Sequence, residues 1–490
     1  MKNPQRFLPG IHFSHFRSRR GRGARDLHLE KTKAARHGLD ALSQTFGSCV
    51  PEHLLARGGD KAFSRNRVFT RQQTFWGFFS QVLDADSGCR EVVRRVQAAR
   101  SLRGQVVPSS STAAYCKARA KLELDVLHSI LQHSSDQLAS HSKRDKSLDD
   151  RRVVVVDGTG LSMPDTPENQ SRWPQSHRQK PGCGFPTARM LGLFDLSTGG
   201  HIAHHLGNKH TSELAALRHL WSALDPSDIL LGDRGFCSYF DIAQLQARQV
   251  DTVTTLKKRK PAKATEAIEV LGDDDLLIQW PKPRWAAHYR YSQADWETLP
   301  EYLPVRQIKV TVGEPGFRTQ SFYLITTLTD PVAYSAESLA DLYRQRWQVE
   351  LYFRDIKTTL DMDVLRCQTP DMVIKEITMH WIVYNGLRTV MIRATKTRPK
   401  VSLNAISFKA CIQAVRQWSA AADPNITPAA QRRVLRELLE SIATATIPDR
   451  PGRTEPRCVK RRPKNYQRMT KPRDQMRVTP HRGKRAKKAA

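Results

Sequence analysis

The chain has 490 residues, enough for two to four domains with sizeable cores. Its formal net charge of +31 favours a polyanionic partner such as nucleic acid, without distinguishing DNA from RNA. No apolar run of about 18 residues could span a bilayer, and the eight dispersed cysteines include no Cys-x-x-Cys pair; we therefore expect no membrane association, no zinc site and a reducing cytoplasm.

Both ends of the chain are rich in basic residues. Residues 1–38 contain many Arg and Gly residues, and residues 451–490 contain 15 Lys or Arg against 2 acidic residues. Such segments bury too little apolar surface to fold alone. We predict a mobile basic arm (1–38) and a disordered basic tail (448–490), both suited to non-specific contact with phosphates.

Residues 39–148 have the pattern of an α-helical N-terminal domain. Residues 74–83 predict a buried helix, and residues 90–100 place valines on one helical face and arginines on the other. The run Ser109–Thr112 is suited to capping a further helix. The basic faces favour a DNA-binding domain, although a helical domain that only packs on its neighbour would show the same pattern.

Residues 149–395 predict an α/β core. The β-branched run Val153–Val156 indicates a buried strand, and residues 189–196 and 201–206 indicate two more strands around a turn. They are followed by a helix from 211, a short strand at 229–231, a helix at 239–247 and a strand at 250–256. This order predicts a mixed sheet with helices on its faces.

The segment 258–330 predicts a β-rich insertion in this core. Residues 305–312 alternate between apolar and polar side chains, and residues 321–327 return after a turn. The tryptophans of the insertion could stack on an unpaired base, but packing on the sheet is the favoured interpretation. Residues 396–447 are predicted to form C-terminal helices.

Two aspartates come at predicted strand ends. Asp157 directly follows the Val153–Val156 strand, where Gly158 would let the chain turn, and Asp233 comes just beyond the strand at 229–231. Carboxylates at the ends of adjacent strands can converge at one edge of a sheet. Ordinary turn or cap chemistry is the alternative for each of them.

A third carboxylate lies on a predicted helix that follows the insertion. At roughly 100° per residue, Tyr343, Arg346, Glu350 and Lys357 fall on one face of a helix. Ordinary charge pairs on a solvated helix would give the same spacing. If this helix packs over the sheet edge, Glu350 completes a set of three hard oxygen ligands, which Mg²⁺ or Mn²⁺ prefers. Two such ions can carry out in-line phosphoryl transfer.

These three segments together resemble the DDE transposases of bacterial insertion sequences. The segments are Asp157-Gly158-Thr159, Asp233-Arg234-Gly235-Phe236 and the helix of Glu350, whose spacing Tyr-x2-Arg-x3-Glu-x6-Lys is the YREK signature of one branch of that family. The resemblance implies an RNase H-like fold for the core. It also implies that Asp157, Asp233 and Glu350 hold two divalent ions and that Tyr343, Arg346 and Lys357 bind DNA phosphates.

The implied function is cut-and-paste transposition by a metal-dependent nuclease and strand transferase. Its partners would be double-stranded DNA, as terminal inverted repeats and as target, and a second copy of the chain in a synaptic complex. The expected location is the cytoplasm, in association with the nucleoid. Two alternatives remain: a catalytically inactive DNA-binding remnant or repressor at element ends, and an RNA-processing nuclease on the same fold.

Two further features are less favoured as functional. Histidines 201, 204, 205 and 210 cluster on a predicted strand and the loop after it, and a metal site there is the less favoured interpretation. Trp347 turns off the face that carries Arg346, so core packing is favoured over DNA contact.

Overall fold

The computed structural model describes residues 39–56, 63, 68–84, 87–102, 104–142, 148–256, 260–286, 291–312, 320–363, 365–421, 427–448, 469–472 and 475–476. The predicted arm (1–38) and most of the predicted tail (448–490) lie outside these residues. The chain divides into two compact units, one of Met1–Val126 with Arg393–Ile447 and one of Leu127–Ile392 with Pro448–Ala490.

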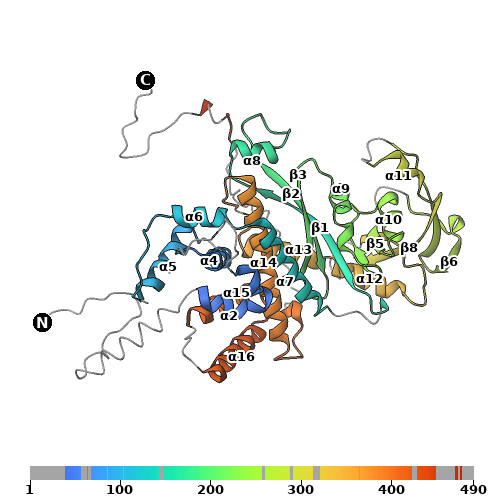
Figure 1. Cartoon of the computed structure of the whole chain (residues 1–490). Coiled ribbons are helices and arrows are strands. Elements are labelled where there is room, and N and C mark those ends of the chain that lie inside the picture. Colours follow the sequence, from blue (N-terminus) through green and yellow to red (C-terminus); the bar gives the residue numbers. More distant parts are fainter. Residues whose placement is uncertain are drawn as a thin grey trace. The chain divides into compact units, whose positions relative to one another are not determined.

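The first unit is helical in its described residues (Figure 1). Its helices are α2 (Leu39–Phe46), α3 (Glu52–Leu55), α4 (Arg71–Leu83), α5 (Cys89–Leu102), α6 (Ala113–Ala120), α15 (Phe408–Ala421) and α16 (Pro428–Thr444). The predicted helices at 74–83 and 90–100 are therefore confirmed. As predicted for α5, its valines are buried, here against Tyr115 of α6, while Arg90 and Arg94 are partly or fully exposed.

Helices from both ends of the sequence share this unit. The Arg416 side chain of α15 donates a hydrogen bond from Nε to the carbonyl oxygen of Leu83 at 2.9 Å and pairs with Asp84 at 3.1 Å. This link ties α15 to the end of α4. The sequence pattern predicted the helices at 396–447 but gave no sign that they pack with the N-terminal ones.

The second unit is a mixed α/β fold built on one nine-stranded sheet. The strands are β1 (Val153–Ser162), β2 (Thr187–Asp195), β3 (His201–Asn208), β4 (Ile229–Leu231), β5 (Asp251–Thr255), β6 (Glu269–Gly272), β7 (Asp275–Pro281), β8 (Tyr302–Val312) and β9 (Gln320–Thr326). Their order is β3-β2-β1-β4-β5-β9-β8-β7-β6. β1, β4 and β5 are parallel neighbours, and β2 and β3 are antiparallel. This large mixed sheet, predicted from the sequence, is consistent with an RNase H-like core.

The insertion extends the same sheet, because β9 pairs antiparallel with β5. Trp280 and Trp296 are only 8% and 5% exposed and pack with aromatic residues of α10 (Tyr239–Gln246). Packing on the sheet is thus confirmed for these two tryptophans. Trp285, in contrast, is 37% exposed.

Helices bury both faces of the sheet around β1 and β2. On one face, α9 (Glu213–Arg218) inserts Leu217 among Val154, Val156 and Leu230. On the other face, Phe194 of β2 meets aromatic rings from α13 (Gln348–Arg354) and α14 (Pro370–Thr395). The edge that carries the predicted aspartates is therefore held by two layers of core packing. The other described helices of this unit are α7 (Leu124–Ala139), α8 (Pro167–Arg172), α11 (Gln293–Glu297) and α12 (Ala336–Gln345).

The single helix predicted to run from Tyr343 to Lys357 is wrong in detail. α12 ends at Gln345 and α13 begins at Gln348, because backbone hydrogen bonds there span three residues, as from Glu350 N to Trp347 O at 3.1 Å. A π-helical turn at 355–359 then carries Lys357. Trp347 lies at the break and is 57% exposed, so its predicted core packing is also wrong.

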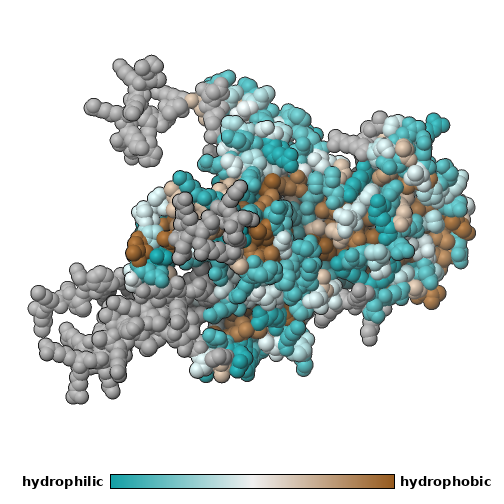
Figure 2. Space-filling view, viewed as in Figure 1, coloured by the Kyte–Doolittle hydropathy of each residue, from teal (hydrophilic) through white to brown (hydrophobic). Residues whose placement is uncertain are grey.

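None of the described helices is long and apolar enough to cross a membrane. Hydrophilic residues cover much of the molecular face drawn in Figure 2, with smaller hydrophobic areas between them.

Candidate active site

Asp157 lies within β1 and not after it. β1 pairs with β4 only from Val153 to Val155, but its pairing with β2 continues to Ser162. Asp157 therefore stands just past the parallel pairing, opposite Gly192 of β2, and Gly158 continues the strand instead of turning it. This corrects the predicted strand end, because pairing with β2 carries β1 well past the hydrophobic run Val153–Val156. The Asp157 Oδ1 atom accepts a hydrogen bond from Gly158 N at 2.7 Å.

Asp233 follows β4, as predicted, in the loop after Leu231. Its Oδ1 atom accepts a hydrogen bond from Gly235 N at 2.6 Å. Burial raises the pKa of Asp157 to about 6, the charge of Asp233 adds to the increase, and the charge of Arg346 opposes it. The two aspartates and Arg346 are therefore within electrostatic reach of one another at this edge of the sheet.

Arg346 also links the third carboxylate to this edge. Its Nη2 atom lies 3.6 Å from Glu350 Oε1, and its guanidinium carbon lies 5.8 Å from the centre of the Tyr343 ring. α13, which carries Glu350, packs against β1. The Glu350 side chain is 39% exposed, so ligands can reach it from solvent.

Tyr343 and Lys357 each contact a strand of the core sheet. The Tyr343 hydroxyl lies 3.2 Å from Thr255 Oγ1 at the end of β5. The Lys357 ammonium donates a hydrogen bond to Thr159 Oγ1 of β1 at 2.8 Å and pairs with Asp363 at 3.1 Å. Although the predicted helix is broken, its polar residues still contact β1 and β5, beyond the parallel pairing of β1 with β4.

A further carboxylate, Glu213, lies at this edge and was missed by the sequence interpretation. A Cβ atom built on Gly158 would lie 2.7 Å from Glu213 Oε1, and one built on Gly235 would lie 3.5 Å from Glu213 Oε2. The charge of Glu213 also contributes to the raised pKa of Asp157. The sequence pattern predicted a helix from 211 and did not single out this residue. The glycines after both aspartates were a signal, but one sequence cannot show what they make room for.

The described residues contain no group of three or more His, Cys, Asp or Glu side chains close enough to hold a metal ion. This finding covers the four histidines as well. His201 Nε2 lies 3.0 Å from His204 Nδ1, and the His201 ring stacks on Trp381 at 4.1 Å. Burial, with the neighbouring histidines His128 and His205, lowers the pKa of His204 to about 3. These rings are part of the packing around β3.

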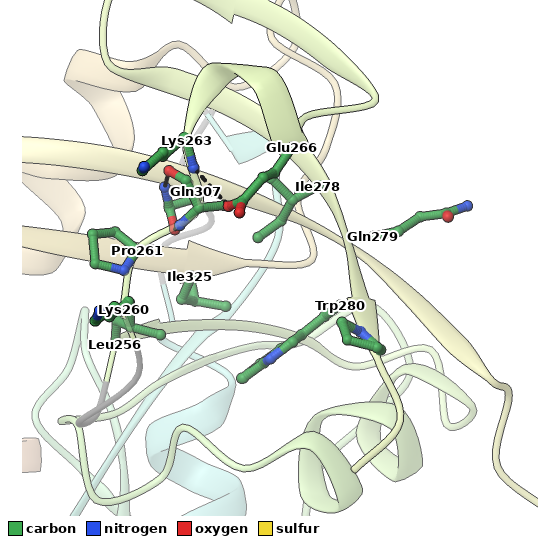
Figure 3. Close-up of a pocket in the computed structure, with 12 residues that line it drawn as sticks. Leu256, Lys260, Pro261, Lys263, Glu266, Ile278, Gln279, Trp280, Gln307 and Ile325 are labelled. Atoms are coloured by element: carbon green, nitrogen blue, oxygen red, sulfur yellow. Dashed lines mark hydrogen bonds between the residues drawn. The ribbon is translucent and has the colours of Figure 1, made fainter.

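A separate cavity of about 560 Å³ lies in the insertion. Figure 3 shows it between Trp280 and Ile278 on one side and Pro261 on another, with Gln307 at its rim. Gln307 exchanges hydrogen bonds of 2.9 and 3.0 Å with the backbone of Ala262, so the side-chain amide is already satisfied. None of the site carboxylates described above lines this cavity.

Known proteins that are similar to this chain are transposases. Residues 148–385 match the family model of the transposase DDE domain. The chain is 24% identical over 447 residues to the transposase InsG for insertion sequence element IS4 of Escherichia coli, a match that covers 89% of this chain and 96% of that protein.

Two other relatives carry similar names. A putative transposase for insertion sequence element IS4SA of Synechocystis sp. is 22% identical over 318 residues, covering 64% of this chain and 79% of that protein. A probable transposase for insertion sequence element IS5377 of Geobacillus stearothermophilus is 37% identical over 92 residues, covering 19% and 24%. Together the matches support a transposase of an insertion sequence with a DDE domain.

Proposed function

We infer that the protein, which its DDE domain and its relatives indicate to be a transposase of an insertion sequence, moves its element by cutting and joining DNA phosphodiesters with Asp157, Asp233 and Glu350. The observation that carries this inference is the accumulation of acidic groups around Asp157 and Asp233, just past the point where the parallel pairing of β1 with β4 ends. In a chain of net charge +31, such an acidic edge is the exception.

The donor groups at this edge are of the chemical type that divalent metal ions prefer, although the described structure does not bring three of them close together. Asp157 and Asp233 each use Oδ1 to accept a backbone hydrogen bond, and among the described residues none donates a hydrogen bond to the second oxygen of either carboxylate. Carboxylate oxygens are hard donors, and a cation would relieve the repulsion between the two charges. Asp157, Asp233 and Glu350 would hold two Mg²⁺ or Mn²⁺ ions, which supply the Lewis acid that activates the attacking hydroxyl and stabilises the leaving oxygen.

The chain's own basic residues would hold the DNA beside these carboxylates. Arg346 presents a planar guanidinium, which can bind two phosphate oxygens together. Lys357 is anchored on β1 through Thr159, and Tyr343 is anchored on β5 through Thr255. Because anchored groups lose little conformational freedom when a phosphate binds, they can orient the scissile bond at small entropic cost.

The first test is cleavage of DNA that carries the element's own terminal inverted repeats, in the presence of Mg²⁺. Glu350→Gln keeps the size of the side chain but removes its charge. We expect it to reduce cleavage by about a thousandfold or more, the equivalent of several kcal/mol of transition-state stabilisation, and to leave binding to the repeats nearly unchanged. Glu337→Gln, an exposed glutamate in the first turn of α12, is the matched control and should cut like the parent.

The same assay separates the alternatives. Binding to the repeats without cleavage in either Mg²⁺ or Mn²⁺ would indicate an inactive remnant or a repressor. Cleavage of structured RNA without preference for the repeats would indicate an RNA-processing nuclease. For the predicted synaptic homodimer, native mass measurement on repeat DNA should find two protein chains with two DNA ends.

A further inference from the structure

We propose that Glu213 is a positioning residue of the carboxylate site, whose side chain would accept hydrogen bonds from water bound to a divalent ion held by Asp157 and Asp233. This inference rests on the proposed function. It assigns to Glu213 a role that the three-carboxylate signature does not include.

The first support is the position of the Glu213 carboxylate between the two aspartate-bearing segments. One of its oxygens lies 2.7 Å from where a Cβ would stand on Gly158, and the other lies 3.5 Å from the corresponding point on Gly235. The first distance is shorter than real Cβ contacts, so any side chain at position 158 would displace the carboxylate. Glycine at position 158 thus leaves room for the carboxylate where it now lies.

The second support is that the fold fixes Glu213 in place. It is the first residue of α9, and the Ser212 side chain caps this helix by accepting a hydrogen bond from Ala215 N at 3.2 Å. One turn later, Leu217 is fully buried in the core that also contains Val156 of β1 and Phe236, which follows Gly235. The same packed core therefore positions the glutamate and both aspartates.

The third support is that the charge of Glu213 has no counterion among the described residues. The hydrogen bonds and ion pairs of the described chain include none to its carboxylate. Placing it next to two aspartates is costly unless a cation binds there. A carboxylate near a metal site that is not itself a ligand commonly accepts hydrogen bonds from the ion's bound waters and tunes its affinity.

A purely structural role is the competing explanation, since a glutamate in the first turn of a helix interacts favourably with the helix dipole. Glu337 in α12 provides the comparison within this chain. It too lies in the first turn of a helix that a serine caps, and it is exposed. If the helix dipole were the whole explanation, neutralising either glutamate would have the same effect.

The experiment is a titration of the full chain, without DNA, with Mn²⁺ alone, in which the free ion is counted by electron paramagnetic resonance. Glu213→Gln should weaken Mn²⁺ binding by roughly tenfold or more, the effect expected of an outer-shell partner, and Glu337→Gln should leave it unchanged. Glu213→Asp should recover part of the affinity. Equal affinity in the parent and Glu213→Gln would overturn the proposal.

A second pair of variants tests the geometry. Gly158→Ala should weaken Mn²⁺ binding in the parent because it displaces the carboxylate, but it should cost nothing more in a Glu213→Ala background. Additive losses would show that Gly158→Ala damages Asp157 directly and would count against the proposal. Asp157→Asn isolates the underlying function: if this variant binds Mn²⁺ as the parent does, the proposed metal site fails. If it loses binding and Glu213→Gln does not, only the role of Glu213 fails.

Discussion

The sheet of the second unit holds acidic residues in two contrasting environments. In the insertion, buried Asp275 pairs through both oxygens with Arg306, at 2.8 and 2.5 Å. At the edge formed by β1 and β4, Asp157 and Asp233 accept only backbone hydrogen bonds and form no ion pair with a described residue. The chain has 79 Lys or Arg against 48 Asp or Glu, so cations are not scarce. Incomplete neutralisation therefore distinguishes the candidate site from the scaffold.

Breaking a scaffold pair should have the largest effect on stability. Asp275→Asn leaves the Arg306 guanidinium, which is 1% exposed, without its counterion, and removing one partner of a buried pair costs about 3–5 kcal/mol. We expect this loss in the free energy of unfolding from urea titration, with DNA cleavage by the folded fraction unchanged. Asp274→Asn, which breaks an exposed pair with Lys309, is the neighbouring control and should leave the free energy of unfolding nearly unchanged. If Asp275→Asn and Asp274→Asn lost the same free energy of unfolding, the buried pair would not be a special part of the scaffold.

Neutralising a carboxylate of the candidate site should instead raise the free energy of unfolding. The folded pKa of Asp157 is raised from 3.8 to about 6, mainly by burial. The penalty on folding is therefore absent well below pH 3.8, grows as pH rises from 3.8 to about 6, and is fully present above that. Without divalent ions at pH 7.5, Asp157→Asn should stabilise the protein by about 1–3 kcal/mol, and near pH 4 the difference should be small.

Thermal unfolding of the parent and Asp157→Asn at these two pH values measures the difference. Excess EDTA removes metal ions, and repeating the scans with Mn²⁺ should stabilise only the parent. A variant less stable than the parent at pH 7.5 would place Asp157 with the scaffold carboxylates.

Hydrophobic patterning predicted the fold well, because it depends on local periods. The runs at 153–156 and 229–231 and the helix at 239–247 correspond to β1, β4 and α10. The patterning could not give the length of β1, since Asp157 to Ser162 are held by pairing with β2 and not by their own hydrophobicity. Nor could it show that the insertion continues the sheet, which depends on pairing between β9 and β5, distant in sequence.

The candidate site was predictable only in part, for a related reason. Asp157, Asp233 and Glu350 have residue types and spacings that point to phosphoryl transfer, and their roles remain predictions. The break between α12 and α13 was not visible, because Arg346 and Trp347 have ordinary helix propensities. Glu213 was not visible either, because its position depends on the packing of a helix onto strands at other places in the chain.

Asp195 provides the smallest test of the contrast, because it is buried and, among the described residues, receives hydrogen bonds but no ion pair. At 3% exposure, it accepts hydrogen bonds from Ser142 Oγ at 2.5 Å, from Ser197 Oγ at 2.7 Å and from Thr198 N at 2.8 Å. Asp195→Asn keeps an oxygen for the turn that follows β2, and the Ser142 hydroxyl only has to reverse from donor to acceptor. We expect a loss of about 1 kcal/mol in the free energy of unfolding.

The sign of the change in the free energy of unfolding of Asp195→Asn shows whether hydrogen bonds alone can offset the cost of burying a carboxylate. A stabilisation in Asp195→Asn, like the one expected for Asp157→Asn, would mean that hydrogen bonds alone do not offset the burial of a charge. The edge of β1 and β4 would then be no different in this respect from other buried carboxylates of the sheet. A small loss would mean that donors directed at both oxygens are sufficient. Because Asp157 and Asp233 have a donor at only one oxygen among the described residues, the deficit at the other oxygen is what a cation would fill.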